Sequence, residues 1–161
     1  MTNCAEFDER LRSFAWADAS KLADWVREQS GVEACVEEGL RRSRERGDWD
    51  AFERYVICAD LHPSPEYVEP LGVVLDERRE DISNETIVDT LNHIRDPSAV
   101  PYLRRAIRFI PETDEFGQLG RKAVWALDRL HTPEALDAIR EEVTDDLPDY
   151  VVEAAQEALA R

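Results

Sequence analysis

The sequence predicts an all-α fold, an α-solenoid in which antiparallel helical hairpins stack in a short right-handed row. Three observations predict it. A proline-led phrase recurs three times in the second half of the chain, a second apolar stripe follows each phrase, and the spacing varies only inside the hairpins. Repeat periods of about 20 to 50 residues are typical of such stacks, because one hairpin cannot bury its apolar face alone.

The recurring phrase defines the first helix of each predicted hairpin. Its openings at Pro65, Pro97 and Pro133 stand 32 and 36 residues apart. Proline is tolerated there because the first helical N–H has no intrahelical partner, and Asp96 or Thr132 can cap the free N–H groups. The apolar residues after each proline lie on one stripe of an α-helix. They are Val68, Leu71 and Leu75, then Val100, Leu103 and Ile107, then Leu136, Ile139 and Val143.

A second stripe predicts the second helix of each hairpin. Its residues are Ile87, Leu91 and Ile94, then Ala123, Leu127 and Leu130, then Ala155 and Leu159. Leu91 and Leu127 each precede the next proline by 6 residues, so the extra length of the middle repeat falls inside its hairpin, in the turn-rich segment 110–117. Helices are predicted near 65–77, 84–95, 98–110, 117–130, 134–143 and 148–160.

The first 64 residues depart from the phrase but keep helical periodicity, and they predict about four helices before residue 62. Terminal repeats usually diverge because one of their faces meets water. We therefore expect a single solenoid domain over residues 1–161. It consists of a divergent capping half at 1–64 and repeats at 65–96, 97–132 and 133–161.

The phrases resemble HEAT repeats, particularly the short bacterial kind similar to those in bilin-lyase-like proteins. The resemblance is strongest over residues 121–136, which run from Arg121-Lys122-Ala123-Val124-Trp125 to Pro133-Glu134-Ala135-Leu136, and it covers residues 65–161. It implies a stack of helical hairpins and leaves activity open, because a fold does not specify a function.

The charge balance is strongly acidic. Thirty-six acids against 20 bases give a net charge of −16, which repels nucleic acid, whose recognition depends on clustered cations. Residues 65–96 carry −6, residues 133–161 carry −7 and residues 1–64 carry −5, whereas residues 97–132 carry +2. We expect a basic protein partner, no nucleic acid and no membrane.

The cysteines and the N-terminus predict a cytoplasmic location. Cys4, Cys35 and Cys58 are odd in number and far apart, which argues against a disulfide framework and for reducing surroundings. Cys35 and Cys58 occupy stripe positions and are expected in the core, whereas Cys4 is expected as an exposed thiol. Residues 1–8 lack the pattern of a secretory signal, and no apolar run is long enough to span a bilayer.

No catalytic, metal-binding or cofactor-binding signature stands out. The chain has no glycine-rich phosphate loop, no G-x-S-x-G and no H-E-x-x-H. His62, His93 and His131 lack the spacing of metal ligands. We therefore expect no enzyme activity, no metal and no cofactor. Some HEAT-like proteins are DNA glycosylases with a basic concave surface, and the acidity of this chain disfavours that alternative.

The arginines of the basic middle repeat leave two interpretations open. Arg104, Arg105 and Arg108 flank the stripe of a first helix and are expected on the outer, convex side. They form either salt bridges to the acidic neighbouring repeats or a patch for phosphate groups.

The second helices are expected to line a concave face, and their exposed columns predict a partner-binding surface. Trp125 falls in a column with two carboxylates, Asp89 and Glu157, so it is expected to face water. It serves either as an aromatic anchor for a partner's arginine or lysine, or it packs against Phe116. The predicted binding residues are Glu85, Asp89, Arg121, Trp125, Asp128, Glu153 and Glu157.

The expected function is a non-enzymatic protein-binding module, possessing an acidic concave groove for a basic partner, as in an immunity or inhibitor protein that neutralises a basic toxin. The alternative is a lyase-like or chaperone-like accessory factor acting on a cofactor-bearing protein, which a deep, partly apolar pocket would favour. A third interpretation, stacking into a homo-oligomer, predicts an apolar patch on an end cap.

Overall fold

The computed structural model describes residues 2–161 and is all-helical over that range. Its α-helices are α1 (Cys4–Ser13), α2 (Ala19–Glu28), α3 (Glu33–Arg46), α4 (Trp49–Leu61), α5 (Val68–Asp76), α6 (Asn84–Ile94), α7 (Val100–Ala106), α8 (Gln118–Leu130), α9 (Pro133–Glu142) and α10 (Asp149–Leu159). Single 3-10 turns at Trp16–Asp18, Pro65–Tyr67 and Pro97–Ala99 precede α2, α5 and α7. Within residues 2–161, no helix combines the length and the apolar character that crossing a bilayer requires.

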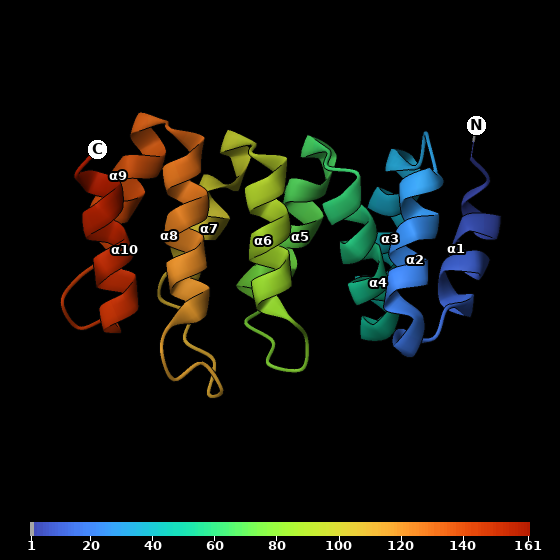
Figure 1. The fold of residues 1–161 in the computed structure, drawn as a ribbon, viewed down its shortest axis with the longest axis horizontal. Helices are drawn as coiled ribbons and strands as arrows, with labels where there is room; N and C mark the ends of the chain where they lie inside the picture. Colours follow the sequence, from blue (N-terminus) through green and yellow to red (C-terminus); the bar gives the residue numbers. More distant parts are fainter. Residues whose placement is uncertain (1) are drawn as a thin grey trace.

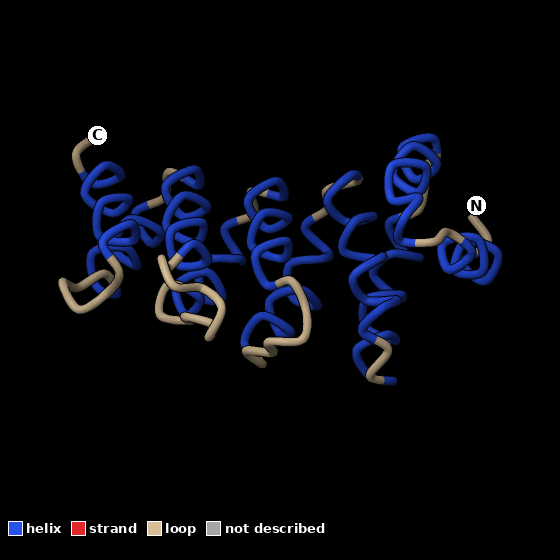
Figure 2. The backbone as a smooth tube through the Cα atoms, turned by 60° about the horizontal axis from the view of Figure 1, so that its bottom comes forward, coloured by secondary structure: helices blue, strands red, loops and turns tan. Residues whose placement is uncertain are grey.

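The helices form two layers that run the length of the molecule (Figure 1). The first layer contains α3, α5, α7 and α9, and each packs on the next. The second layer contains α4, α6, α8 and α10, which also pack in sequence, and α2 continues it beyond α4. α1 closes the N-terminal end against α3 and α4. Figure 2 shows that the loops inside the last three hairpins lie together along one edge of the stack. The predicted solenoid is confirmed.

The predicted helix starts are confirmed by their caps. The hydroxyl of Thr132 accepts the N–H of Ala135 at 3.2 Å, the carboxylate of Asp96 accepts the N–H of Ser98 at 2.9 Å, and Asp48 caps α4 in the same way. The first helix of the middle repeat is shorter than predicted, because α7 ends at Ala106 and residues after it form turns. The insertion predicted at 110–117 lies in the loop 107–117 between α7 and α8.

One apolar core extends through both layers from Phe7 to Ala158. The stripe residues of the repeats are buried in it, among them Leu71, Leu103 and Leu127. Cys58 is also buried, as predicted, and burial raises the pKa of its thiol to about 12. The hairpins therefore share their cores with their neighbours rather than forming separate ones.

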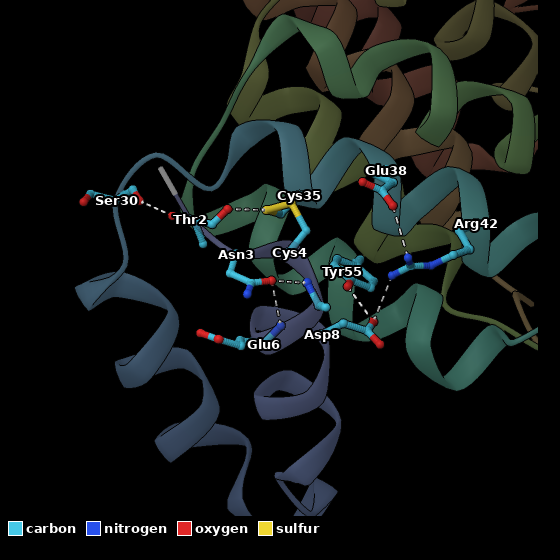
Figure 3. Close-up of a disulfide and its surroundings, with 11 residues drawn as sticks. Thr2, Asn3, Cys4, Glu6, Asp8, Ser30, Cys35, Glu38, Arg42 and Tyr55 are labelled. Carbon is cyan, nitrogen blue, oxygen red and sulfur yellow. Dashed lines mark hydrogen bonds and ion pairs between the residues drawn. A yellow bond between two sulfur atoms is a disulfide. The ribbon is translucent and has the colours of Figure 1, made fainter.

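A disulfide joins Cys4 of α1 to Cys35 of α3 (Figure 3). The expectation that the cysteines form no disulfide is therefore wrong, and with it the prediction of an exposed Cys4 thiol and the argument for reducing surroundings. Cys35 is buried in the core, as predicted. The two residues are 31 positions apart in the sequence, but α1 folds back against α3 and brings their Cα atoms to 5.0 Å. The disulfide fastens the helix that caps the N-terminal end of the stack.

We predict that Cys4→Ser lowers the free energy of unfolding by about 4 kcal/mol, because the disulfide closes a loop with a sequence separation of 31 and removes that much chain entropy from the unfolded state. Chemical denaturation with and without reductant measures the effect. Reductant should destabilise the unsubstituted protein and leave the variant unchanged, and equal stability of the two proteins under oxidising conditions would contradict the prediction.

Beside the disulfide, Asp8 connects α1 to α4 and α3 (Figure 3). Its carboxylate accepts the hydroxyl of Tyr55 at 2.6 Å and pairs with Arg12 at 2.8 Å and Arg42 at 3.5 Å. Partial burial opposes the charged form of Asp8, but these hydrogen bonds and cations outweigh it and hold its pKa below the usual range. Burial of the ring, together with the hydrogen bond to the same carboxylate, raises the pKa of Tyr55.

Because the pKa of Asp8 is lower in the folded protein than in the unfolded chain, its contribution to stability is present above about pH 4. It is lost as the pH falls through the folded value. We predict that Asp8→Asn destabilises the protein at neutral pH and flattens the fall in stability below pH 4. Denaturation curves at several acidic pH values measure this, and an unchanged pH slope would count against it.

Candidate partner-binding face

The face of the second layer contains three hollows between successive helices. The largest, here called the acidic cleft, has a volume of about 570 Å³ and lies between the first turns of α6 and α8. The second, the apolar pocket, has about 220 Å³ and lies between α4 and α6. The third, the aromatic pocket, has about 70 Å³ and lies between α8 and α10. Ile82, Ser83 and Thr86 line both the cleft and the apolar pocket, so these two adjoin.

The acidic cleft is lined by more carboxylates than cations. Its charged residues are Glu80, Glu85, Asp89, Asp114, Glu115 and Lys122. Two of the carboxylates already bind backbone, because Glu80 accepts the N–H of Glu112 at 2.9 Å and Asp114 accepts two N–H groups of α8. The remaining carboxylates belong to α6 and to the loop before α8, and they give the cleft its negative character.

Lys122 of α8 reaches across the cleft to two carboxylates of α6. Its ammonium group lies 2.7 Å from Asp89 and 3.0 Å from Glu85. Burial opposes its charged form, but the hydrogen bonds to the two carboxylates outweigh burial and raise the pKa of Lys122. One ammonium group therefore pairs with two carboxylates, so the three side chains together keep a net negative charge.

Asn84, at the start of α6, contributes a buried polar atom to the lining of the cleft. The residue is 5% exposed. Its amide NH₂ donates to the carbonyl of Arg79, whereas its side-chain oxygen accepts no hydrogen bond from any residue in 2–161. A buried acceptor without a partner costs about 1–3 kcal/mol, and this oxygen has almost no surface open to the cleft.

An aromatic cluster separates the cleft from the end of the stack. Phe116, which lines the cleft, is 55% exposed and meets the ring of Tyr150 edge-on at 6.1 Å between centroids. The guanidinium of Arg121 lies 4.3 Å from the centroid of Trp125 and 5.5 Å from that of Tyr150. Trp125 is 38% exposed. Glu153 lies beside these rings in the aromatic pocket.

The apolar pocket is built from α4, α6 and Trp16. Its apolar lining residues are Trp16, Phe52, Val56, Ile57, Ile82 and Ile87. The indole N–H of Trp16 donates to Asp50 at 2.5 Å, and the buried guanidinium of Arg54 lies 4.5 Å from its ring centroid. These contacts hold the Trp16 ring at the pocket, although it is 43% exposed.

The structure gathers six of the seven predicted binding residues on this face. Glu85 and Asp89 line the acidic cleft, and Arg121, Trp125, Glu153 and Glu157 line the aromatic pocket. Asp128 differs from the expectation. It is 6% exposed, and its carboxylate pairs with Arg161 at 3.0 Å, so it is not presented to a partner.

Trp125 is exposed, as predicted, and the interpretation in which it packs on Phe116 is not what the structure shows. Its role as an aromatic anchor for a partner stays a prediction. The ring partner of Phe116 is Tyr150, and Trp125 is covered by Arg121 of its own chain. The stacking arginine that we expected from a partner is thus already present within the protein.

Sequence reasoning missed Trp16, Lys122 and Asn84 as parts of the face. In the repeat alignment, Lys122 falls about one helical turn before the position that Asp89 occupies in the preceding repeat. The alignment could therefore have indicated this ion pair. Trp16 lies in a 3-10 turn outside any stripe, and its place beside α4 follows from tertiary packing alone.

The arginines of the middle repeat form salt bridges to neighbouring hairpins. Arg105 pairs with Asp76 at 2.8 Å. Arg104 pairs with Glu141 and Glu142 at 2.7 Å, and Arg108 lies 3.4 Å from Glu142. The structural interpretation of these cations is confirmed, and they lie on first-layer helix α7 and the turn after it.

The chain belongs to the HEAT-repeat family. The family model for HEAT repeats matches residues 68–160, which is more than half of the sequence. Neither the curated proteins nor the solved structures contain a significant match to the chain. Within residues 2–161, no group of three or more His, Cys, Asp or Glu side chains is arranged to hold a metal ion.

We predict that Asp114→Ala destabilises the protein by about 1–2 kcal/mol, because its carboxylate accepts the N–H groups of Gln118 at 2.7 Å and Leu119 at 2.9 Å at the start of α8. Glu115→Ala is the matched control, since it removes an exposed neighbouring carboxylate. Thermal or chemical denaturation compares the two variants, and equal effects would contradict this role of Asp114.

Proposed function

We propose that this protein is a non-catalytic HEAT-repeat module that docks a basic protein on the face formed by α6, α8 and α10. The observation that carries the proposal is the acidic cleft, in which Glu85 and Asp89 share the single lysine Lys122. HEAT repeats are generally protein-interaction modules, and extended stacks present long surfaces for that purpose.

The distribution of cations supports this choice of face. The helices α6 and α10 contain no lysine or arginine. The cations Arg104, Arg105 and Arg108 lie on or just after α7 in the other layer, where they pair with carboxylates of neighbouring hairpins. The helix α8 contributes Arg121, Lys122 and Arg129, but α6, α8 and α10 together hold six acids against these three bases. The face is therefore net negative, and its field steers a positively charged partner toward the cleft.

An inhibitor of a basic toxin, such as a nuclease, is the specialisation that this charge favours. Inhibitors of that kind gain their speed from electrostatic steering, and the net charge of −16 supplies it. The cleft is lined mainly by polar side chains, whereas sites for small organic ligands are mostly apolar. The accessory-factor alternative therefore has the weaker support.

We predict that the double substitution Glu85→Gln, Asp89→Asn weakens binding of a fluorescent Lys/Ser-repeat peptide about tenfold at low salt, or about 1.4 kcal/mol. Fluorescence anisotropy measures the dissociation constant. Affinity should also fall as salt rises, because the ion pairs are exposed enough to be screened.

Glu134→Gln, Asp137→Asn is the matched control, since it removes the same charge from α9 in the first layer, where both residues are exposed. Its effect on affinity should be less than about twofold. The proposal fails if the unsubstituted protein binds a Glu/Ser peptide of equal length as well, or if both double variants weaken binding equally.

A further inference from the structure

We infer that the apolar pocket between α4 and α6 is an anchor site for one aliphatic or aromatic side chain of the docked basic segment. This inference rests on the proposed function. It adds an apolar residue to the basic residue that the acidic cleft recognises in the partner. The bound segment crosses the second-layer helices in extended form, with its apolar residue in the pocket and its lysine or arginine in the adjoining acidic cleft.

The size of the pocket selects a single side chain. Its volume of about 220 Å³ is several times that of one water molecule, about 30 Å³. It lies below the range of about 300–1,000 Å³ typical of pockets that enclose a drug-sized ligand. A leucine, isoleucine or phenylalanine side chain on a neighbouring backbone is the occupant that fits.

The polar groups around the pocket favour an apolar occupant, because they already have partners. Trp16 donates its indole N–H to Asp50 at 2.5 Å, Glu53 accepts the N–H of Ser83 at 2.8 Å, and the hydroxyls of Ser83 and Thr86 share a hydrogen bond at 2.7 Å. Burying polar groups usually costs free energy because they lose their hydrogen bonds to water. An apolar side chain that displaces water from this pocket avoids that cost, since each of these groups keeps its partner within the protein.

The adjoining acidic cleft determines which kind of residue lies next to the apolar residue in the partner segment. Ile82 and Thr86 line both hollows, so a segment that leaves the pocket enters the cleft directly. There it meets the carboxylates of Glu85 and Asp89. Lysine and arginine are all-donor side chains, so they match this lining in both charge and hydrogen bonding.

The spacing of the motif follows from the spacing of the helices. The pocket lies between α4 and α6 and the cleft between α6 and α8, so the two are one helix step apart. Packed helices lie about 8–10 Å apart, and an extended chain rises about 3.3 Å per residue. The apolar and basic residues of the partner therefore stand about three positions apart.

Labelled Lys/Ser peptides that carry one leucine, scanned from one to seven positions away from a pair of lysines, test the inference by fluorescence anisotropy. Leucine should raise affinity about tenfold over asparagine at the same position, with the largest gain near three positions. A gain that is equal at every position would overturn the extended crossing, and no gain at any position would overturn the anchor site.

Variants of the pocket separate this inference from the proposed function. Ile57→Asp, which places a charge in the pocket, and Ile57→Trp, which fills it from a partly exposed position that does not line the acidic cleft, should each remove the preference for leucine. Both should still bind the leucine-free lysine peptide in a salt-dependent way. Ile110→Asp, at an exposed apolar residue of the loop before α8, is the control and should keep the preference.

The outcomes distinguish the two proposals. If no lysine peptide binds, the proposed function fails and the anchor site fails with it. If lysine peptides bind but leucine adds nothing, the anchor site alone is wrong. Sedimentation of the free protein supplies a further check, because a dimer that Ile57→Asp dissociates would show that a second copy of the chain, rather than a partner segment, occupies the pocket.

Discussion

The fold depends on the sharing of one apolar core between successive hairpins. A two-helix hairpin can bury only one side of each helix, so each repeat is stable only when the next one covers it. Close approaches between and within the hairpins show how tight this packing is. Gly72 of α5 lies where any Cβ would enter the ring of Tyr102 in the next repeat, and a Cβ on Gly120 would come within 2.6 Å of the carbonyl oxygen of Ile107.

The stacking of the hairpins also determines where the charged side chains lie. First-layer helices carry arginines that reach across the joints between hairpins, as Arg41 does to Glu69 and Arg105 does to Asp76. Exposed ion pairs of this kind stabilise a protein only slightly, by about 0–1 kcal/mol each. Their larger consequence is that they offset most of the charge of the first layer, where α3, α5, α7 and α9 hold seven arginines against ten acids. The second layer keeps its carboxylates with few cations to oppose them, and the acidic cleft follows from this asymmetry.

The repeats could be predicted from the sequence because their stripes depend on helical periodicity, and the caps at Asp96 and Thr132 depend on local chemistry. The repeat alignment also placed Glu85, Asp89 and Trp125 on one face. The first 64 residues offered no such alignment. The Cys4–Cys35 disulfide and the position of Trp16 arise where α1 and the turn after it fold back on α3 and α4. The spacing of residues in the sequence does not predict that α1 folds back against α3 and α4.

The cations that the protein itself places on the face limit what a partner can gain there. A lysine of the partner that reaches Glu85 and Asp89 replaces or joins Lys122, so much of the new Coulomb energy offsets an ion pair that already exists. In the same way, a partner's arginine finds Arg121 already stacked on Trp125. Charge complementarity at such a site contributes more to the rate of encounter than to affinity. Tight binding then requires apolar burial, and on this face the fixed Trp16 ring and the pocket between α4 and α6 provide a place for it.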